Sequence, residues 1–162
     1  VTAICTDKTG TLTKSIMEVV DVHTADDEAK QKLFLATSLC HTVDIAHENN
    51  TEKLLGDPTE VALVRRGMGE GYHPEEQAKL FKRVDDIPFS SERKMMTTLH
   101  VIDGVDTAFI KGAPERILGL ATAEFVDGEA KKITRARLEE IHDEYEKMPS
   151  QGLRVLGYAF RQ

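Results

Sequence analysis

Apolar residues recur with a helical period over much of the first half of the chain. Positions three or four residues apart predict three helices. These run from Asp26 or Asp27 to about His41, from Pro58 to the glycines at 67, 69 and 71, and from near Pro74 to Leu80 or Phe81. Residues 16–22 alternate like a strand, and the polar residues 48–53 predict a surface loop. His41 and His47 precede this loop, and two histidines six residues apart are a poor metal pair.

The start of the second predicted helix carries a strong local signal. Asp57 is a suitable N-cap, and Pro58 fits the first helical position because its missing N–H would be unpaired there in any case. Glu60, three residues after Asp57, would complete a capping box. A purely structural role for Glu60 is therefore one open interpretation.

The second half of the chain changes to strands. Residues 84–89, 95–102, 105–110 and 153–160 are rich in β-branched and aromatic residues. Asp103-Gly104 predicts a two-residue hairpin turn, and Asp127-Gly128 predicts another turn. Helices are expected over 113–120 and from the cap Thr134 to about Met148. Antiparallel strands with helices between them predict an α+β fold in which helices flank an antiparallel sheet.

Composition narrows the classes of partner. The 162 residues carry a formal net charge of −7, which disfavours nucleic acid and anionic membrane surfaces as partners. The only cysteines, Cys5 and Cys40, are too few for a disulfide framework or a thiolate metal site. No apolar run reaches the roughly 18 residues of a membrane helix, so this chain itself is not expected to enter the membrane.

The most specific stretch lies at the N-terminus. The short apolar run at 1–4 predicts a buried strand, and Asp7 would lie in the tight loop at the carboxyl end of this strand. Open α/β sheets bind their ligands at the carboxyl ends of their strands. An aspartate there can act as a nucleophile and form an acyl phosphate. Backbone N–H groups around Thr9, Gly10 and Thr11 would hold the phosphoryl oxygens, and Mg2+ would offset their charge.

The string Asp7-Lys8-Thr9-Gly10-Thr11-Leu12-Thr13 resembles the phosphorylation signature of the P-type cation-transporting ATPases. The resemblance implies that Asp7 is the catalytic residue, that residues 8–11 form the phosphate loop, and that Asp7 and Thr9 lie at the Mg2+ site. It also implies that residues 1–14 begin a haloacid-dehalogenase-like phosphorylation domain. Residues 15–160 would then form the nucleotide-binding domain.

Four further stretches resemble the nucleotide-binding domain of the same family, and they occur in the family's order. In the first, 56–60, the resemblance implies that Glu60 accepts a hydrogen bond from the adenine amino group. In the second, 88–96, it implies that Phe89 stacks on the base and that Lys94 meets the phosphates or the ribose edge. Ser91 departs from the pattern, because calcium pumps often have arginine there. Core packing for Phe89 and a solvated surface for Lys94 are the alternatives.

The third stretch, Lys111-Gly112-Ala113-Pro114-Glu115, matches a family motif residue for residue. Lys111 would point into the nucleotide pocket, and Gly112 would let the backbone approach the ligand closely. In the fourth, Arg154 would approach the β-phosphate and Leu156 would lie beneath the adenine, although an arginine in an apolar strand needs no ligand. These motifs favour the branch that moves calcium, magnesium, protons or sodium and potassium.

The resemblance implies an ATP-binding, Mg2+-dependent cytoplasmic piece of an integral membrane protein. Its partners would be ATP and the remaining phosphorylation, actuator and membrane domains of the parent chain. A soluble haloacid-dehalogenase-type phosphatase with a cap domain is a rival, but that class has an acid/base aspartate where this chain has Thr9. A non-catalytic interaction module is a second rival interpretation. A phosphatase assay and a thermal-shift titration with nucleotides discriminate among the three.

We predict that this chain binds ATP without turning it over. The family's Thr-Gly-Asp and Gly-Asp-Gly-x-x-Asp segments, which complete its Mg2+ site, do not occur in the sequence. Phosphoryl transfer depends on such positioning and charge stabilisation. Radiolabelled ATP should therefore leave no acid-stable, hydroxylamine-sensitive label on Asp7, and finding that label would refute the prediction.

Overall fold

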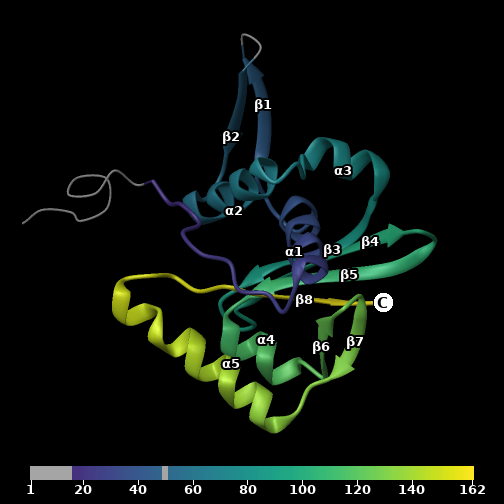
Figure 1. The fold of residues 1–162 in the computed structure, drawn as a ribbon. Helices are drawn as coiled ribbons and strands as arrows, with labels where there is room; N and C mark the ends of the chain where they lie inside the picture. The colour runs from purple at the N-terminus through teal and green to yellow at the C-terminus, as the bar shows by residue number, and fades with distance from the viewer. Residues whose placement is uncertain (1–15, 49–50) are drawn as a thin grey trace, which may run out of the picture.

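A four-stranded antiparallel sheet forms the centre of the computed structural model, which describes residues 16–48 and 51–162. Its strands lie in the order β3-β4-β5-β8 (Figure 1). They are β3 (Arg83–Ser90), β4 (Met95–Ile102), β5 (Val105–Gly112) and β8 (Gly157–Arg161). Two smaller hairpins, β1 (Asp44–Glu48) with β2 (Thr51–Leu55) and β6 (Ala123–Val126) with β7 (Glu129–Lys132), flank it.

Helices lie on both sides of this sheet. α1 (Asp27–Leu39), α2 (Pro58–Gly69) and α3 (Pro74–Leu80) lie on one side, and α4 (Pro114–Leu120) and α5 (Arg135–Lys147) lie on the other (Figure 1). A short 3-10 turn, Pro149–Gln151, connects α5 to the approach to β8. The α+β class predicted from the sequence, with helices flanking an antiparallel sheet, is confirmed.

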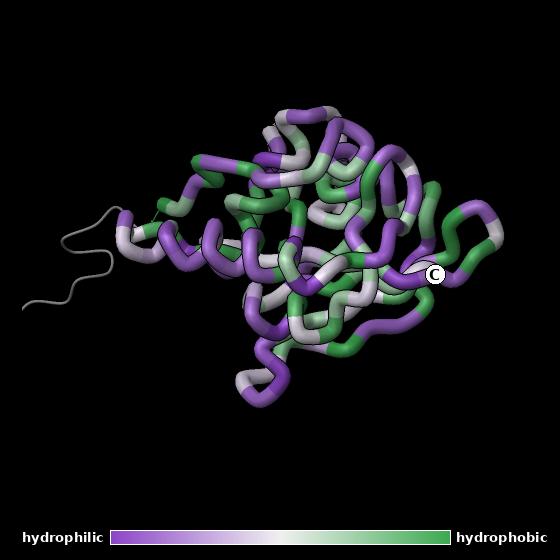
Figure 2. Tube along the Cα trace, turned by 60° about the horizontal axis from the view of Figure 1, so that its bottom comes forward, coloured by the Kyte–Doolittle hydropathy of each residue, from purple (hydrophilic) through white to green (hydrophobic). Residues whose placement is uncertain are grey.

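The main core lies between α1 and the sheet. Ala36, Leu39 and Cys40 of the α1 region pack there with Met96, Ile102 and Phe109 of the strands. Phe109 has no exposed surface, and burial of such a ring is a large apolar contribution to stability. Hydrophilic residues dominate the projecting turns (Figure 2), and no residue of α5 is fully buried.

Local signals in the sequence explain several element boundaries. Asp26 caps α1 by accepting from the Ala29 N–H, and Asp57 caps α2 by accepting from the N–H groups of Thr59 and Glu60. The Asp103-Gly104 turn joins β4 to β5 with positive φ at both residues, 52° and 80°. The predicted hairpin is therefore confirmed, since these are the angles that such a turn needs.

Three predicted elements were wrong or misplaced. Residues 16–22 form no strand, because no neighbouring strand in the described part of the chain pairs with them. Residues 48–53 are not simply a loop, since Glu48 ends β1 and Thr51 begins β2. The last strand begins at Gly157 rather than at residue 153, because its partner β5 already ends at Gly112, opposite Gly157.

Gly67 also differs from the prediction. It lies inside α2 rather than ending it, and it is buried where α2 meets α1. A Cβ added at Gly67 would lie 2.5 Å from Thr37 Oγ1, whose hydroxyl already donates to the Phe34 carbonyl oxygen. The absence of a side chain therefore permits the two helices to approach closely.

The predicted strand at 1–4 and the phosphorylation loop, with Asp7, Lys8, Thr9, Gly10 and Thr11, lie outside the described residues. The proposed division between residues 1–14 and 15–160 therefore stays a prediction. Among the helices of the described residues, none combines the length and apolar character needed to cross a membrane.

We predict that Gly67→Ala lowers the free energy of unfolding by about 1–3 kcal/mol, because the new methyl group overpacks the α1–α2 contact. Gly69→Ala is the matched control, since a Cβ there meets nothing within 4 Å. It should leave stability unchanged or raise it by up to about 1 kcal/mol. Urea unfolding of both variants measures the difference. Equal stability of the two variants would contradict the role assigned to Gly67.

Candidate functional site

The nucleotide-site residues predicted from the sequence gather at one edge of the central sheet. β3 and β5 end at this edge, and β4 and β8 begin there. Met95 pairs with both Ser90 and Gly112, and Gly112 also pairs with Gly157. This register brings Phe89, Lys94, Lys111, Gly112 and Leu156 together. The start of α2 reaches the same edge through Glu60.

A buried ion pair joins the sheet to α2. Lys111 Nζ lies 2.6 Å from Glu60 Oε2 and donates a second hydrogen bond, 2.8 Å long, to the Cys40 carbonyl oxygen. The two side chains are only 5% and 16% exposed. Lys111 is therefore almost completely buried. Its ammonium group is turned into the protein, where it holds the Glu60 carboxylate in place.

This contact also bears on the capping-box interpretation of the Glu60 side chain. In a capping box the Glu60 side chain would return to the backbone N–H of Asp57. The cap is instead one-sided, because Asp57 accepts from the backbone N–H groups of Thr59 and Glu60 while the Glu60 carboxylate contacts Lys111. The capping-box interpretation of the Glu60 side chain was therefore wrong.

Arg154 is tied to the start of the same helix. Its Nη1 donates to Thr59 Oγ1 over 2.7 Å, although the two residues are 95 positions apart. Arg154 is exposed, and its contact with Thr59 places the guanidinium group at the start of α2. An arginine held in this way by one neutral hydroxyl keeps most of its five donors for an anionic ligand.

Lys94 and Gly112 meet at the turn between β3 and β4. Lys94 has a positive φ of 55°, and its carbonyl oxygen accepts from the Ala113 N–H over 3.0 Å. A Cβ on Gly112 would overlap that oxygen and Met95. Gly112 thus permits two backbone segments to touch, in addition to any approach of a ligand. The Lys94 ammonium stays half-exposed, 3.2 Å from Glu115.

Phe89 is the most conspicuous exposed group at this edge. Its side chain on β3 is 61% exposed, so the core-packing alternative was wrong. Leu156, just before β8, is half-buried. An exposed aromatic ring such as that of Phe89 can stack on a planar base. The Glu60 carboxylate and the cations of Lys94 and Arg154 at the same edge could contact the polar groups of such a ligand.

Two pockets of the described residues lie elsewhere. One of about 380 Å3 lies between α1, β1, α3 and the start of β3, and it is lined by residues including His41, Arg83 and His100. A second, of about 120 Å3, lies between β2 and α3. Neither is lined by a predicted nucleotide residue. The edge that carries Phe89 therefore lies outside both of these pockets.

Burial perturbs the histidines of the larger pocket. Burial, together with the positive charges of Arg83 and Lys111, lowers the pKa of His41 to about 4. Burial also lowers the pKa of His100, whose Nδ1 hydrogen-bonds to the Phe81 carbonyl oxygen. Both rings are therefore neutral at pH 7, and neither adds a positive charge for an anionic ligand.

Sequence reasoning missed the partners of the predicted residues. Thr59 positions Arg154, Glu115 pairs with Lys94, and the Cys40 carbonyl oxygen shares the Lys111 ammonium group. Thr59 and Glu115 lie within the motifs that drew attention to their neighbours, so a closer look at those motifs could have named them. No local pattern identifies the Cys40 carbonyl, because it is 71 residues from Lys111.

Comparison with known proteins agrees with this arrangement. The family model described as P-type ATPase, cytoplasmic domain N, matches residues 29–162. The chain therefore belongs to this family. A calcium-transporting ATPase of Lactococcus lactis is 38% identical over 168 residues, covering 98% of this chain and 19% of that protein.

Other relatives are similar over the same extent. A calcium-transporting ATPase of Listeria monocytogenes is 36% identical over 172 residues, covering 98% of this chain and 19% of that protein. The cation-transporting ATPase pma1 of Synechocystis is 30% identical over 191 residues, covering 98% of this chain and 21% of that protein. The chain thus spans about a fifth of the length of the curated relatives it matches.

We predict that Glu60→Gln lowers the free energy of unfolding by roughly 3 kcal/mol, because it leaves the buried Lys111 ammonium group without its counter-charge. Glu115→Gln, which breaks the exposed pair with Lys94, should cost less than about 1 kcal/mol. The double variant Glu60→Leu/Lys111→Met should recover much of the loss. Denaturant unfolding tests all three variants, and equal costs for the two Gln variants would show that burial of the pair is unimportant.

Proposed function

We propose that this chain binds ATP at the open edge of the central sheet. The observation that carries the proposal is that the exposed ring of Phe89 lies at the same edge of the sheet as a buried ion pair, in which Lys111 fixes the orientation of Glu60. The adenine stacks on Phe89, with Leu156 beneath it, and the Glu60 carboxylate accepts from the adenine amino group. Lys111 acts as a positioning residue for Glu60.

The cations at the same edge suit the rest of the nucleotide. Lys94 is half-exposed, and its pairing with Glu115 is a surface contact that a phosphate can replace at little cost. Arg154 offers a fork of N–H donors that matches phosphate oxygens. Lys94 and Arg154 therefore serve the ribose and phosphate groups, and Gly112 keeps the backbone clear where the strands meet.

In the parent protein, we propose that the bound ATP phosphorylates Asp7. Loss of the γ-phosphoryl group leaves ADP, and the Asp7 carboxylate gains it as an acyl phosphate. Lys8, Thr9, Gly10 and Thr11 surround the group, and Asp7 and Thr9 would hold Mg2+, which offsets the phosphoryl charge. This assignment rests on the resemblance of residues 7–13 to the family signature and on membership of the family.

The parent would couple this phosphorylation to cation transport. The relatives are named calcium-transporting or cation-transporting ATPases, which supports a cation as cargo and favours calcium within the branch that the motifs suggest. This chain would then be the cytoplasmic nucleotide-binding part of an integral membrane protein. It would work together with the phosphorylation, actuator and membrane domains of the same polypeptide.

We predict that Phe89→Ala weakens ATP binding by about 1–3 kcal/mol, or roughly 5- to 150-fold in Kd, because the stacking surface is lost. Ile87→Ala is the matched control, since Ile87 is 53% exposed on the same strand but carries no ring. Titration calorimetry with ATP measures both variants. Phe89→Tyr should keep the affinity of the native chain. Equal affinities for the native chain and Phe89→Ala would end the stacking proposal.

A further inference from the structure

The hairpin of β1 and β2 extends away from the rest of the molecule (Figure 1). His47 on β1 and Glu52 on β2 are direct cross-strand partners. Side chains of directly opposed residues lie on the same face of a hairpin. The imidazole and the carboxylate therefore lie side by side near the end of the hairpin, and both are exposed.

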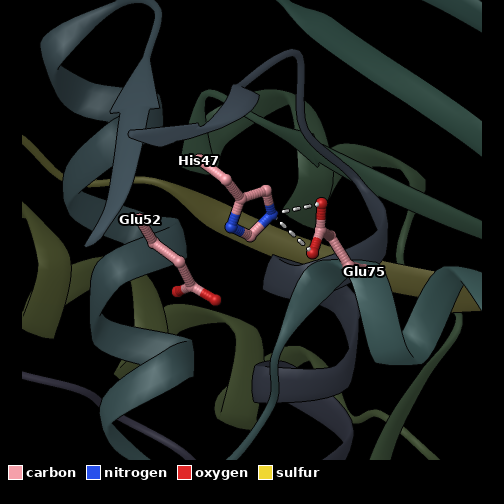
Figure 3. A group of neighbouring side chains, drawn as sticks. All are labelled: His47, Glu52 and Glu75. Atoms are coloured by element: carbon pink, nitrogen blue, oxygen red, sulfur yellow. Dashed lines mark hydrogen bonds and ion pairs between the residues drawn. The ribbon is translucent and has the colours of Figure 1, made fainter. Parts of the chain in front are cut away.

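α3 adds a third ligand-type group from a distant part of the sequence. Glu75 lies in the first turn of α3, directly after the buried Pro74. Its two carboxylate oxygens lie 3.0 and 3.1 Å from His47 Nε2. One ligand atom of each of His47, Glu52 and Glu75 lies within 4.8 Å of the others. The imidazole thus lies between the two carboxylates (Figure 3).

We propose that His47, Glu52 and Glu75 bind a divalent transition-metal ion of the zinc class, which would connect the hairpin to α3. One imidazole nitrogen and two carboxylate oxygens are a donor set that zinc accepts, and three protein ligands leave a position for water. Mg2+ and Ca2+ prefer oxygen ligands alone, so the imidazole favours a transition metal over them.

The surroundings of the three groups are consistent with an ion. Glu52 and Glu75 also line the pocket of about 120 Å3 between β2 and α3, together with His73 and Glu76. Lys79 lines the same pocket, but its one ammonium group faces the three carboxylates of Glu52, Glu75 and Glu76, and a divalent cation would balance the remaining negative charge. The site shares no residue with the sheet edge proposed for ATP, so the two proposals stand or fall separately.

Titration of this 162-residue chain with Zn2+ by calorimetry tests the proposal. We expect one ion per chain, with micromolar affinity. His47→Ala, Glu52→Gln and Glu75→Gln should each weaken binding at least tenfold, while Mg2+ at the same concentration gives no saturable heat. His142→Ala is the matched control, since His142 is an equally exposed histidine that lies within 4 Å of two carboxylates on α5. It should bind Zn2+ like the native chain.

Two results would overturn the proposal. One is the absence of saturable Zn2+ binding below millimolar concentration, which would leave only an ordinary ion pair between His47 and Glu75. The other is a loss of affinity in His142→Ala as large as in His47→Ala, which would show scattered surface binding. Nitrogen NMR shifts of the imidazoles provide a second measurement. Zn2+ should shift the His47 ring first, and a first shift at any other ring counts against the site.

Discussion

The contact between Lys111 and Glu60 is the interaction on which the edge proposed for ATP depends. A lysine near the end of β5 lies almost completely buried, and its charge is offset by one carboxylate and one backbone carbonyl. The pair connects the central sheet, the end of α1 and the start of α2. Because an unpaired buried charge is so costly, these three elements keep one relative position.

The residues of this edge fall into two groups. Lys111 and Thr59 turn toward the protein and orient other side chains. Phe89, Lys94 and Arg154 keep much of their surface free. A binding surface built in this way has fixed components beneath exposed ones, and such preorganisation reduces the entropy that a ligand loses on binding.

Local signals predicted most of the elements correctly. Asp26, Asp57 and Thr134 cap helices as expected, and Asp103-Gly104 makes the expected turn. The failures have a common physical cause. Residues 16–22 alternate like a strand but find no partner among the described residues, whereas the polar residues 51–53 belong to β2 because β1 pairs with them. A strand is decided by its neighbour, and local periodicity does not reveal the neighbour.

The sequence by itself determined the family and the α+β class, and it predicted the residues of the edge proposed for ATP, because short motifs and caps act over a few positions. Only the tertiary structure decided where the Lys111 charge points and that Glu75 lies beside His47. Those contacts join residues 51 and 28 positions apart, and they form through packing of whole elements. No spacing within one segment encodes them.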